Sequence, residues 1–401
     1  MPLCARSHLA WDDLPMEIVA FLAGVICLGL VLWDVFETIV VPRPTPSQLR
    51  LGRHLVPWTW RAWRWLGERA RTGLGRDLFY GLYAPFAAVL LLAAWIFLLI
   101  VGYGLILYAI RDQLYPVPTN FGTVLYFAAA SVLTVGYGDV IPVGPAARFL
   151  ALAGAATGLG LVALVITFLF SLFGSYQRRE RLVVALSARA KSPPSAVTLL
   201  ENYVRLGLVD QLPALFAEWE RWSAEVLDSH VAYPLLGYFR SSHDNLSWVS
   251  ALGAMLDAAA LVLTTVRDVP RGQAELMKRV GAHFVEDLSN YFGYKGTDGS
   301  IVDESQFDVA YARLAAAGYS LEPAETAWRS FERARTIYAS RLEFLASYWA
   351  TSAPVWIAPR VSITSPAHQA GTPEREHVPG AGGLPQTGGS LPATAKESEQ
   401  R

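Results

Sequence analysis

Three long apolar runs occupy the N-terminal part of the chain, and charged residues gather between and after them. The runs cover residues 16–41, 78–110 and 146–176. Because about 20 consecutive apolar residues cross the hydrocarbon core of a bilayer, each run predicts a transmembrane helix. The second run is longer than a perpendicular crossing needs, so we expect it to tilt or to extend beyond the lipid.

The composition also indicates a membrane protein. Of the 401 residues, 53% are hydrophobic and only 17% are charged, and the mean hydropathy is +0.31. A soluble domain is less apolar than this. The first run does not resemble a cleaved signal peptide, because Asp12 and Asp13 precede it in place of basic residues and its apolar stretch is too long. We therefore expect it to stay in the mature protein.

The arginines predict the orientation of the three helices. Basic residues favour the cytoplasmic side of short loops. Segment 42–77 is rich in arginine, whereas the stretch from Arg111 to Pro145 sets that one arginine against Asp112 and Asp139. We expect an extracytoplasmic N-terminus at 1–15, a cytoplasmic segment at 42–77 and a cytoplasmic C-terminus, in a cell membrane.

Between the second and third runs the sequence reads TVGYGD, at residues 134–139. Backbone that is neither helix nor sheet is tolerated at membrane depth only where it is buried in protein or lines water. Residues 120–133 are apolar and long enough for a helix that crosses half the membrane, with Thr119 or Asn120 as its N-cap. The negative end of that helix would point to the membrane centre, where it favours a cation.

The two glycines of TVGYGD allow left-handed backbone, so successive carbonyl groups can turn the same way. Where several copies surround one axis, an oxygen-lined tube results. The carbonyl oxygens of such a tube, with the Thr134 hydroxyl, replace the water shell of a monovalent cation, as they do in potassium channel filters.

The segment matches the selectivity filter of the tetrameric potassium channels residue by residue, and residues 78–179 resemble that family. The matching residues are Thr134, Val135, Gly136, Tyr137, Gly138 and Asp139. A shorter GYG at 102–104, inside the second run, carries no such meaning.

The resemblance implies a C4 homotetramer with an outer pore helix at 78–111, a pore helix and filter at 112–145 and an inner pore helix at 146–176. It implies K⁺ as the permeant ion, held at residues 134–137, with Asp139 at the outer mouth. The implied partners are membrane lipid and further copies of the chain, and no cofactor is expected.

Two positions depart from the family pattern. Many bacterial members carry a second threonine where this chain has Leu133, and some carry a glutamate, bonded to the filter aspartate, where it has Ala130. Asp139 then needs another partner, either Tyr126 or water. Inactivation behaviour therefore does not transfer from those relatives.

The inner helix carries candidates for a gate and for the wall of the cavity below the filter. Gly158 and Gly160 lie where related channels have a hinge, but close helix packing explains small residues equally well. Val162, Ile166 and Phe170 recur at intervals of four and are candidates to line the cavity.

The gating stimulus is not visible in the sequence. None of the runs holds the regular arginines of a voltage sensor. The stretch PWTWRAWRW in segment 42–77 predicts a helix at the inner membrane surface. Asp34 and Glu37, one helical turn apart, are expected to pair with arginines such as Arg43, and a proton-sensing or ion-sensing role is the alternative.

The region 177–352 predicts a cytoplasmic helical domain, which is the candidate regulator. The inner helix is expected to continue until Pro193, and later apolar residues recur at helical spacing, as at Leu212, Leu215, Trp219, Trp222 and Val226. The domain is acidic, which argues against nucleic acid. Without catalytic or metal-ligand spacing we expect no enzyme. Residues 353–401 are rich in Pro, Gly, Ser and Thr and predict disorder.

The sequence thus predicts an all-α membrane protein with three transmembrane helices, a re-entrant pore helix and a cytoplasmic helical domain, acting as a potassium channel. One alternative is a weakly selective cation channel, because Leu133 replaces a hydroxyl. Another, of a different class, is a membrane-anchored receptor or signalling protein.

The predicted orientation can be tested with introduced cysteines. Cysteines near residue 10 and just after Ile110 should react with impermeant reagents from outside intact cells, whereas cysteines near residues 70 and 200 should react only after permeabilisation. Labelling of residue 70 from outside would reverse the orientation argued from the arginines.

Overall fold

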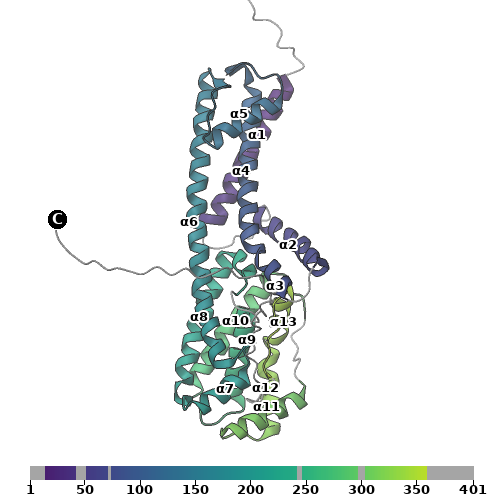
Figure 1. The fold of residues 1–401 in the computed structure, drawn as a ribbon, viewed down its shortest axis with the longest axis vertical. Coiled ribbons are helices and arrows are strands. Elements are labelled where there is room, and N and C mark those ends of the chain that lie inside the picture. The colour runs from purple at the N-terminus through teal and green to yellow at the C-terminus, as the bar shows by residue number, and fades with distance from the viewer. Residues whose placement is uncertain (1–13, 42–50, 71–73, 242–245, 297–302, 359–401) are drawn as a thin grey trace, which may run out of the picture. The chain divides into compact units, whose positions relative to one another are not determined.

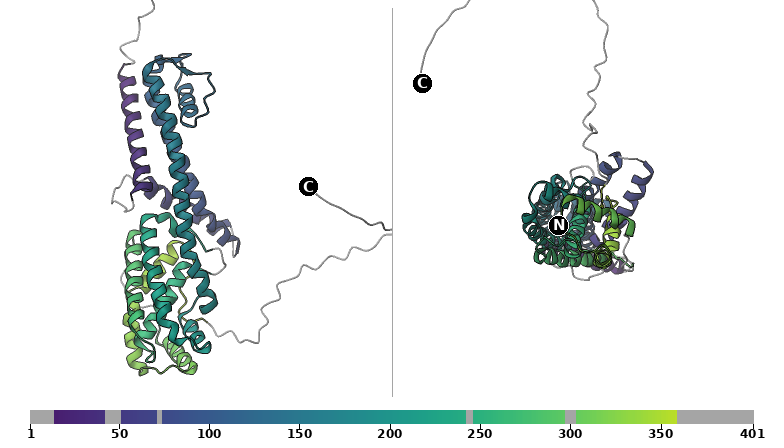
Figure 2. Two further views of the ribbon diagram at one scale, coloured as in Figure 1. Left: turned by 90° about the vertical axis from the view of Figure 1, so that its left-hand side faces the viewer. Right: turned by 90° about the horizontal axis from the view of Figure 1, so that it is seen from below.

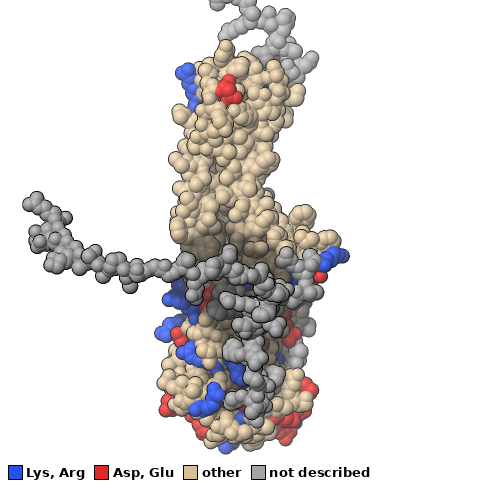
Figure 3. Space-filling view, viewed as in Figure 1, with Lys and Arg blue, Asp and Glu red and all other residues tan. Residues whose placement is uncertain are grey.

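The computed structural model describes residues 14–41, 51–70, 74–241, 246–296 and 303–358, and its regular structure is almost entirely helical (Figure 1). Three helical stretches are long and apolar enough to cross a membrane, namely Pro15–Val40, Gly75–Ala109 and Pro145–Ala190. In Figure 3 the surface over these helices carries few charged side chains, and most of the Lys, Arg, Asp and Glu lie over the C-terminal helices. The chain is an all-α membrane protein.

The first span packs along the second. Helix α1 (Leu14–Val35) continues as a π-helical turn at Phe36–Val40 and lies against α4 (Tyr83–Ala109). A Cβ on Gly24 would lie 2.7 Å from the Gly102 carbonyl oxygen, so the two backbones approach closely. A Cβ on Gly104 would lie 3.0 Å from the Leu125 side chain of α5. The glycines of the 102–104 GYG therefore serve helix packing.

The second span contains a break that the apolar pattern does not predict. Helix α3 (Leu74–Gly81) ends one residue before α4 begins, and Leu82 forms a turn between them. Pro85 has no N–H to donate to the Gly81 carbonyl, which accounts for the interruption.

The segment between the second and third spans leaves and returns at the same end of the helices. A short 3₁₀ turn at Arg111–Gln113 leads into β1 (Leu114–Tyr115), which pairs antiparallel with β2 (Ile141–Pro142). Helix α5 (Phe121–Val132) lies between these strands in the chain and packs against both α4 and α6 (Figures 1 and 2).

Helix α6 (Pro145–Ala190) passes from the membrane region into the C-terminal helices. Its 46 residues make a helix about 70 Å long, more than twice the thickness of a hydrocarbon core. It contacts α4 and α5 of the membrane region and α7, α8 and α9 of the C-terminal helices. Figure 2 shows it running unbroken from one group of helices into the other. As the sequence predicts, the helix ends just before Pro193.

The C-terminal helices form a bundle around a central helix, α9. Every residue of α9 from Trp248 to Val262 is buried, which explains why this helix is apolar on all sides. The helices of the bundle are α7 (Ala196–Arg205), α8 (Leu212–Ala232), α9 (Trp248–Thr264), α10 (Gly272–Tyr291), α11 (Glu304–Ala317), α12 (Ala324–Thr336) and α13 (Ala339–Tyr348), with 3₁₀ turns at Val209–Gln211 and Pro234–Tyr238. The residues that predict α8, from Leu212 to Val226, are buried at the expected spacing.

Packed structure continues past Ser352, the boundary expected from composition. Trp356 is buried, its ring lies 5.2 Å from that of Phe331, and its carbonyl accepts hydrogen bonds from Val197 N and Ser195 Oγ. The bundle therefore extends to Ala358. The predicted disorder of the remaining tail lies outside the described residues.

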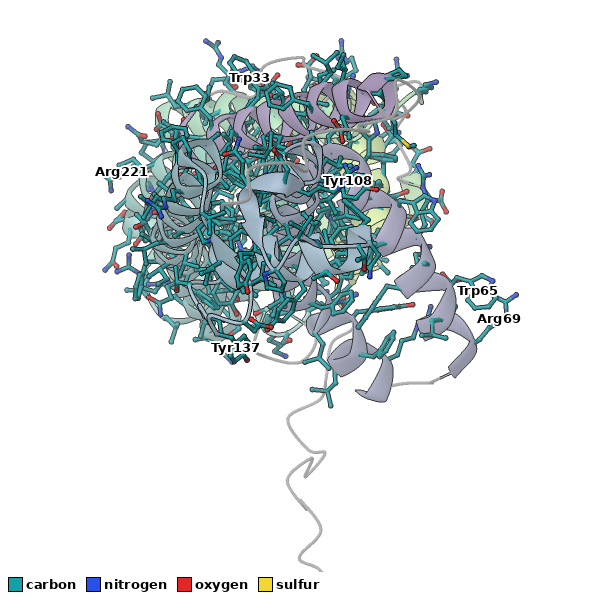
Figure 4. The ribbon with its side chains drawn as sticks, turned by 90° about the horizontal axis from the view of Figure 1, so that it is seen from above. Trp33, Trp65, Arg69, Tyr108, Tyr137 and Arg221 are labelled. Carbon is teal, nitrogen blue, oxygen red and sulfur yellow. The ribbon has the colours of Figure 1, made fainter. Side chains whose placement is uncertain are left out.

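Helix α2 (Leu51–Ala70), which contains the PWTWRAWRW stretch, attaches to the bundle by one face. Trp60 is 4% exposed and donates from its indole N–H to the Tyr348 carbonyl, 2.9 Å away. Trp58 and Trp65 are exposed, and Figure 4 shows Trp65 and Arg69 standing away from the other helices. Anchoring of α2 at a membrane surface stays a prediction. Trp58 and Trp65 are the tryptophans whose exposed side chains could make that contact.

A buried arginine joins α6 to the bundle. The guanidinium of Arg179 contacts Glu180 at 3.0 Å and donates to the carbonyls of Leu236 and Phe239 at 2.9 and 2.8 Å. It also donates to Nε2 of His230 at 3.1 Å. A buried charge is tolerated only with such partners, so this cluster fixes the position of α6 against the turn after α8.

The same contacts keep His230 neutral. Arginine can only donate, so Nε2 of His230 must accept, and its Nδ1–H donates to the Val226 carbonyl 2.9 Å away. Burial lowers the pKa of His230 well below its usual value, and the positive charge of Arg179 lowers it further.

This lowered pKa predicts a pH dependence of stability. The unfolded chain takes up a proton on His230 near pH 6.5 while the folded chain does not, so this contribution to the free energy of unfolding is complete above about pH 6.5. Below that it falls by up to about 1.4 kcal/mol per pH unit, until the folded pKa is reached. Chemical unfolding in detergent between about pH 5 and pH 8 should therefore show a weaker pH dependence for His230→Gln. The exposed His283→Gln is the control, and equal slopes in both variants would contradict the assignment.

Candidate functional site

Helix α5 begins at a side-chain cap and directs its C-terminus at the TVGYGD segment. Asn120 is the N-cap, and its Oδ1 accepts a hydrogen bond from Thr123 N at 3.0 Å, as one of the two candidate caps in the sequence predicts. The helix ends at Val132, and the chain enters the segment directly after Leu133. The negative end of the helix dipole therefore lies beside residues 134–138.

The backbone of the segment alternates into the left-handed region. The φ angles are 57° at Thr134, 60° at Gly136 and 81° at Gly138. Glycine adopts this region without cost, whereas threonine rarely does. The left-handed backbone that the sequence predicts is present at both glycines. The positive φ at Thr134 is not predicted by the sequence.

The N–H groups of the segment turn back toward α5. Val135 and Gly136 both donate to the Ala130 carbonyl, at 2.8 and 3.3 Å, and Thr134 donates to the Ser131 carbonyl at 3.0 Å. Within the described residues, no hydrogen bond is recorded that ends on a carbonyl of residues 134–138. Within the part of the chain that the structure describes, these carbonyls are acceptors without a hydrogen-bond partner.

The segment lies on the surface of the single chain. All residues from Leu133 to Asp139 are exposed, whereas Val132 and Val140 on either side are buried. Figure 4 shows Tyr137 at the edge of the molecule, on the side opposite Trp33 of α1. The first span therefore lies away from the TVGYGD segment (Figure 4).

Two aromatic residues hold the outer end of the segment. The Tyr137 ring is parallel to that of Tyr126, at 6.3 Å between centroids and 6° between planes. The Tyr126 hydroxyl donates to Oδ1 of Asp139 at 3.3 Å. This is one of the two partners that the sequence suggests for Asp139, given that Ala130 has no carboxylate to offer.

The two hinge candidates of α6 differ in their surroundings. A Cβ on Gly158 would lie 1.9 Å from the Val132 carbonyl oxygen at the end of α5, whereas one on Gly160 would meet no atom within 4 Å. Gly158 is therefore required for the close contact between α5 and α6. The sequence alone does not distinguish this packing role from the role of a hinge. The α6 helix is continuous through both glycines.

The proposed cavity residues of α6 all lie on an exposed face in the single chain. Val162, Ile166 and Phe170 are 45%, 50% and 76% exposed. Leu161, Val165 and Phe168 on the other side of the helix are buried. The exposed face is apolar and has no partner within the described part of the chain.

Asp34, one of the two carboxylates in the first span, has two partners that the sequence does not predict. Its two carboxylate oxygens accept from Leu51 N at 2.7 Å and from the Trp95 indole at 2.6 Å, and it is 4% exposed. It thereby holds the start of α2 against α4. Glu37 is also buried. The expected partner Arg43 lies outside the described residues.

Sequence reasoning missed two side-chain contacts that support the site. The Thr157 hydroxyl of α6 donates to the Tyr103 hydroxyl of α4 at 3.0 Å. The Arg179 cluster was also missed, because Arg178, Arg179 and Arg181 look alike in sequence. The described residues contain no group of three or more His, Cys, Asp or Glu that could hold a metal ion.

Comparison with known proteins agrees with the site. Residues 88–175 match a protein-family model described as ion channel. This match runs from within α4 through α5 and the TVGYGD segment into α6. No curated protein and no solved structure matches the chain. The match supports a channel function in a multi-pass membrane protein.

The two α6 glycines give a matched pair of variants. Gly158→Ala should lower the thermal unfolding midpoint by several degrees or prevent assembly, because its Cβ would overlap the backbone carbonyl of Val132. Gly160→Ala should leave the midpoint unchanged or raise it, because the site is open and alanine favours helix. Equal effects of the two substitutions would show that the α5–α6 contact is not as close as described.

Proposed function

We propose that this chain is the subunit of a homotetrameric, potassium-selective channel that conducts K⁺ passively through a pore formed by residues 134–138. The observation that carries the proposal is a run of exposed residues at the C-terminal end of α5 whose backbone carbonyls have no hydrogen-bond partner among the described residues. Buried carbonyls require a partner, and lipid offers none. Four copies around one axis turn these acceptors into ligands for a cation.

The chemistry of the segment favours a weakly held, dehydrated monovalent cation. The carbonyls of residues 134–137 and the Thr134 hydroxyl replace the hydration shell, and the α5 dipole adds a negative potential. Potassium is the ion that such a filter passes. No tightly bound cofactor is part of the proposal.

Symmetry assigns roles to the surrounding helices. In a C4 assembly, α6 lines the axis below the filter and its exposed face at Val162, Ile166 and Phe170 borders the cavity. Gly160 is then the remaining hinge candidate, since Gly158 is committed to packing. We also propose, from the arginines of the sequence, an outward N-terminus and a cytoplasmic bundle.

Opening of this pore is proposed not to depend on voltage. The described residues of the three spans contain no ladder of arginines. The bundle is the candidate regulator, because α6 continues into it and Arg179 fixes the two together. A weakly selective cation channel is the second candidate, since Leu133 offers no hydroxyl below Thr134.

Substitution of Gly138 tests the filter. Gly138 has a φ of 81°, and a Cβ in left-handed backbone costs about 1–2 kcal/mol in each of four subunits. Gly138→Ala should therefore abolish K⁺ flux into liposomes while the protein still purifies as the same oligomer. Gly29→Ala in α1, where a Cβ meets no atom within 4 Å, should retain full flux. Undiminished, selective flux through Gly138→Ala would refute the proposed pore.

A further inference from the structure

A cavity of about 330 Å³ lies where the membrane helices meet the bundle. All three candidate spans reach it, through Thr38, Leu91 and Phe168, and the bundle contributes Leu235 and Phe292. Thr38 lies two residues before the end of the first span. The cavity is therefore at the level where the membrane helices give way to the polar part of the chain.

Two arginines of α2 line this cavity without a counter-charge. Arg53 and Arg61 both border it, and both are exposed. Within the described part of the chain neither makes a recorded ion pair or hydrogen bond, and no aspartate or glutamate lines the cavity. By contrast, Arg64 of the same helix bonds to Glu68 at 2.8 Å, and Arg69 lies 4.0 Å over the Trp65 ring.

Apart from Thr38, the other side chains of the cavity wall are apolar or aromatic. Leu91, Phe168, Leu235 and Phe292 face it together with several tyrosines. A guanidinium group binds phosphate through paired hydrogen bonds, whereas the apolar wall offers nothing to a small hydrated anion. The combination fits a molecule that has both a phosphate and hydrocarbon.

We propose that this cavity binds an anionic phospholipid, with its phosphate between Arg53 and Arg61 and the upper part of an acyl chain against the apolar wall. The volume accommodates a headgroup and part of a chain, so the remaining chains lie along the apolar surface of the spans. Basic pockets beside membrane helices are suited to anionic headgroups in this way.

The bound lipid would contact the helix that leads to the pore. Phe168 of α6 lines the cavity and packs edge-on against Tyr233, with 5.5 Å between ring centroids. Tyr233 directly follows α8, so the lipid touches both partners of this contact. Occupancy biases opening if the two states of the pore bind the lipid differently. Only this last step rests on the proposed channel function.

Binding is tested on the full-length protein by native mass spectrometry with phosphatidylglycerol. Arg53→Gln and Arg61→Gln should each weaken phosphatidylglycerol binding about fivefold, and the double variant about 30-fold, since each arginine–phosphate hydrogen bond contributes about 1 kcal/mol. The control Arg69→Gln removes the same charge from the same helix, and it should change binding less than about twofold because Arg69 does not line the cavity. An equal loss in Arg69→Gln would reduce the effect to general surface attraction and overturn the site.

Two further ligands separate the lipid from its parts. Phosphatidylcholine with the same acyl chains should bind wild type about as weakly as phosphatidylglycerol binds the double variant. Glycerol 3-phosphate, the headgroup chemistry without chains, should not displace phosphatidylglycerol. Equal binding of the two lipids, or displacement by glycerol 3-phosphate, would overturn the proposal in favour of a general apolar site or a soluble-anion site.

The regulatory step has its own readout. In planar bilayers of phosphatidylcholine, added phosphatidylglycerol should change the open probability of wild type and of Arg69→Gln but not that of the double variant. An unchanged open probability with intact binding would overturn the regulatory step alone. Complete absence of current in wild type would refute the proposed channel function and leave the binding result standing.

Discussion

The carbonyl groups of residues 134–138 constrain the arrangement of the whole membrane region, because they have no hydrogen-bond partner among the described residues. They are exposed in the single chain and lie at the end of a helix between two membrane spans, where lipid cannot satisfy them. The proposed assembly would remove this cost by enclosing these groups around ions and water. The backbone is left-handed at Gly136 and Gly138, and the N–H groups of Val135 and Gly136 bond back to the Ala130 carbonyl.

The neighbouring helices hold this segment through close backbone contacts. Gly158 of α6 approaches the end of α5, and Gly104 of α4 approaches its side. The same α6 helix then leaves the membrane region and is fixed to the bundle through Arg179. One continuous helix therefore connects the region of the proposed lipid cavity with the region of the TVGYGD segment, and we propose that movement of the bundle acts along it.

The features that the sequence predicts well depend on local pattern. The apolar runs predict the three candidate spans, and Asn120 predicts the N-cap of α5. The two glycines of TVGYGD predict left-handed backbone at their positions. The features that it misses depend on contacts between distant residues. The turn after α8 decides which of the clustered arginines is buried, because its carbonyls bond to Arg179. The cavity is lined by residues as far apart in the chain as Arg53 and Tyr348, so no short stretch of sequence predicts it.

Reversal potentials of the purified protein in planar bilayers test the central claim most directly, with potassium on one side and an equal concentration of sodium on the other. A carbonyl filter at residues 134–138 predicts a reversal potential shifted far toward the potassium equilibrium potential. A reversal potential near zero, with robust current, would contradict potassium selectivity and identify a general cation pore.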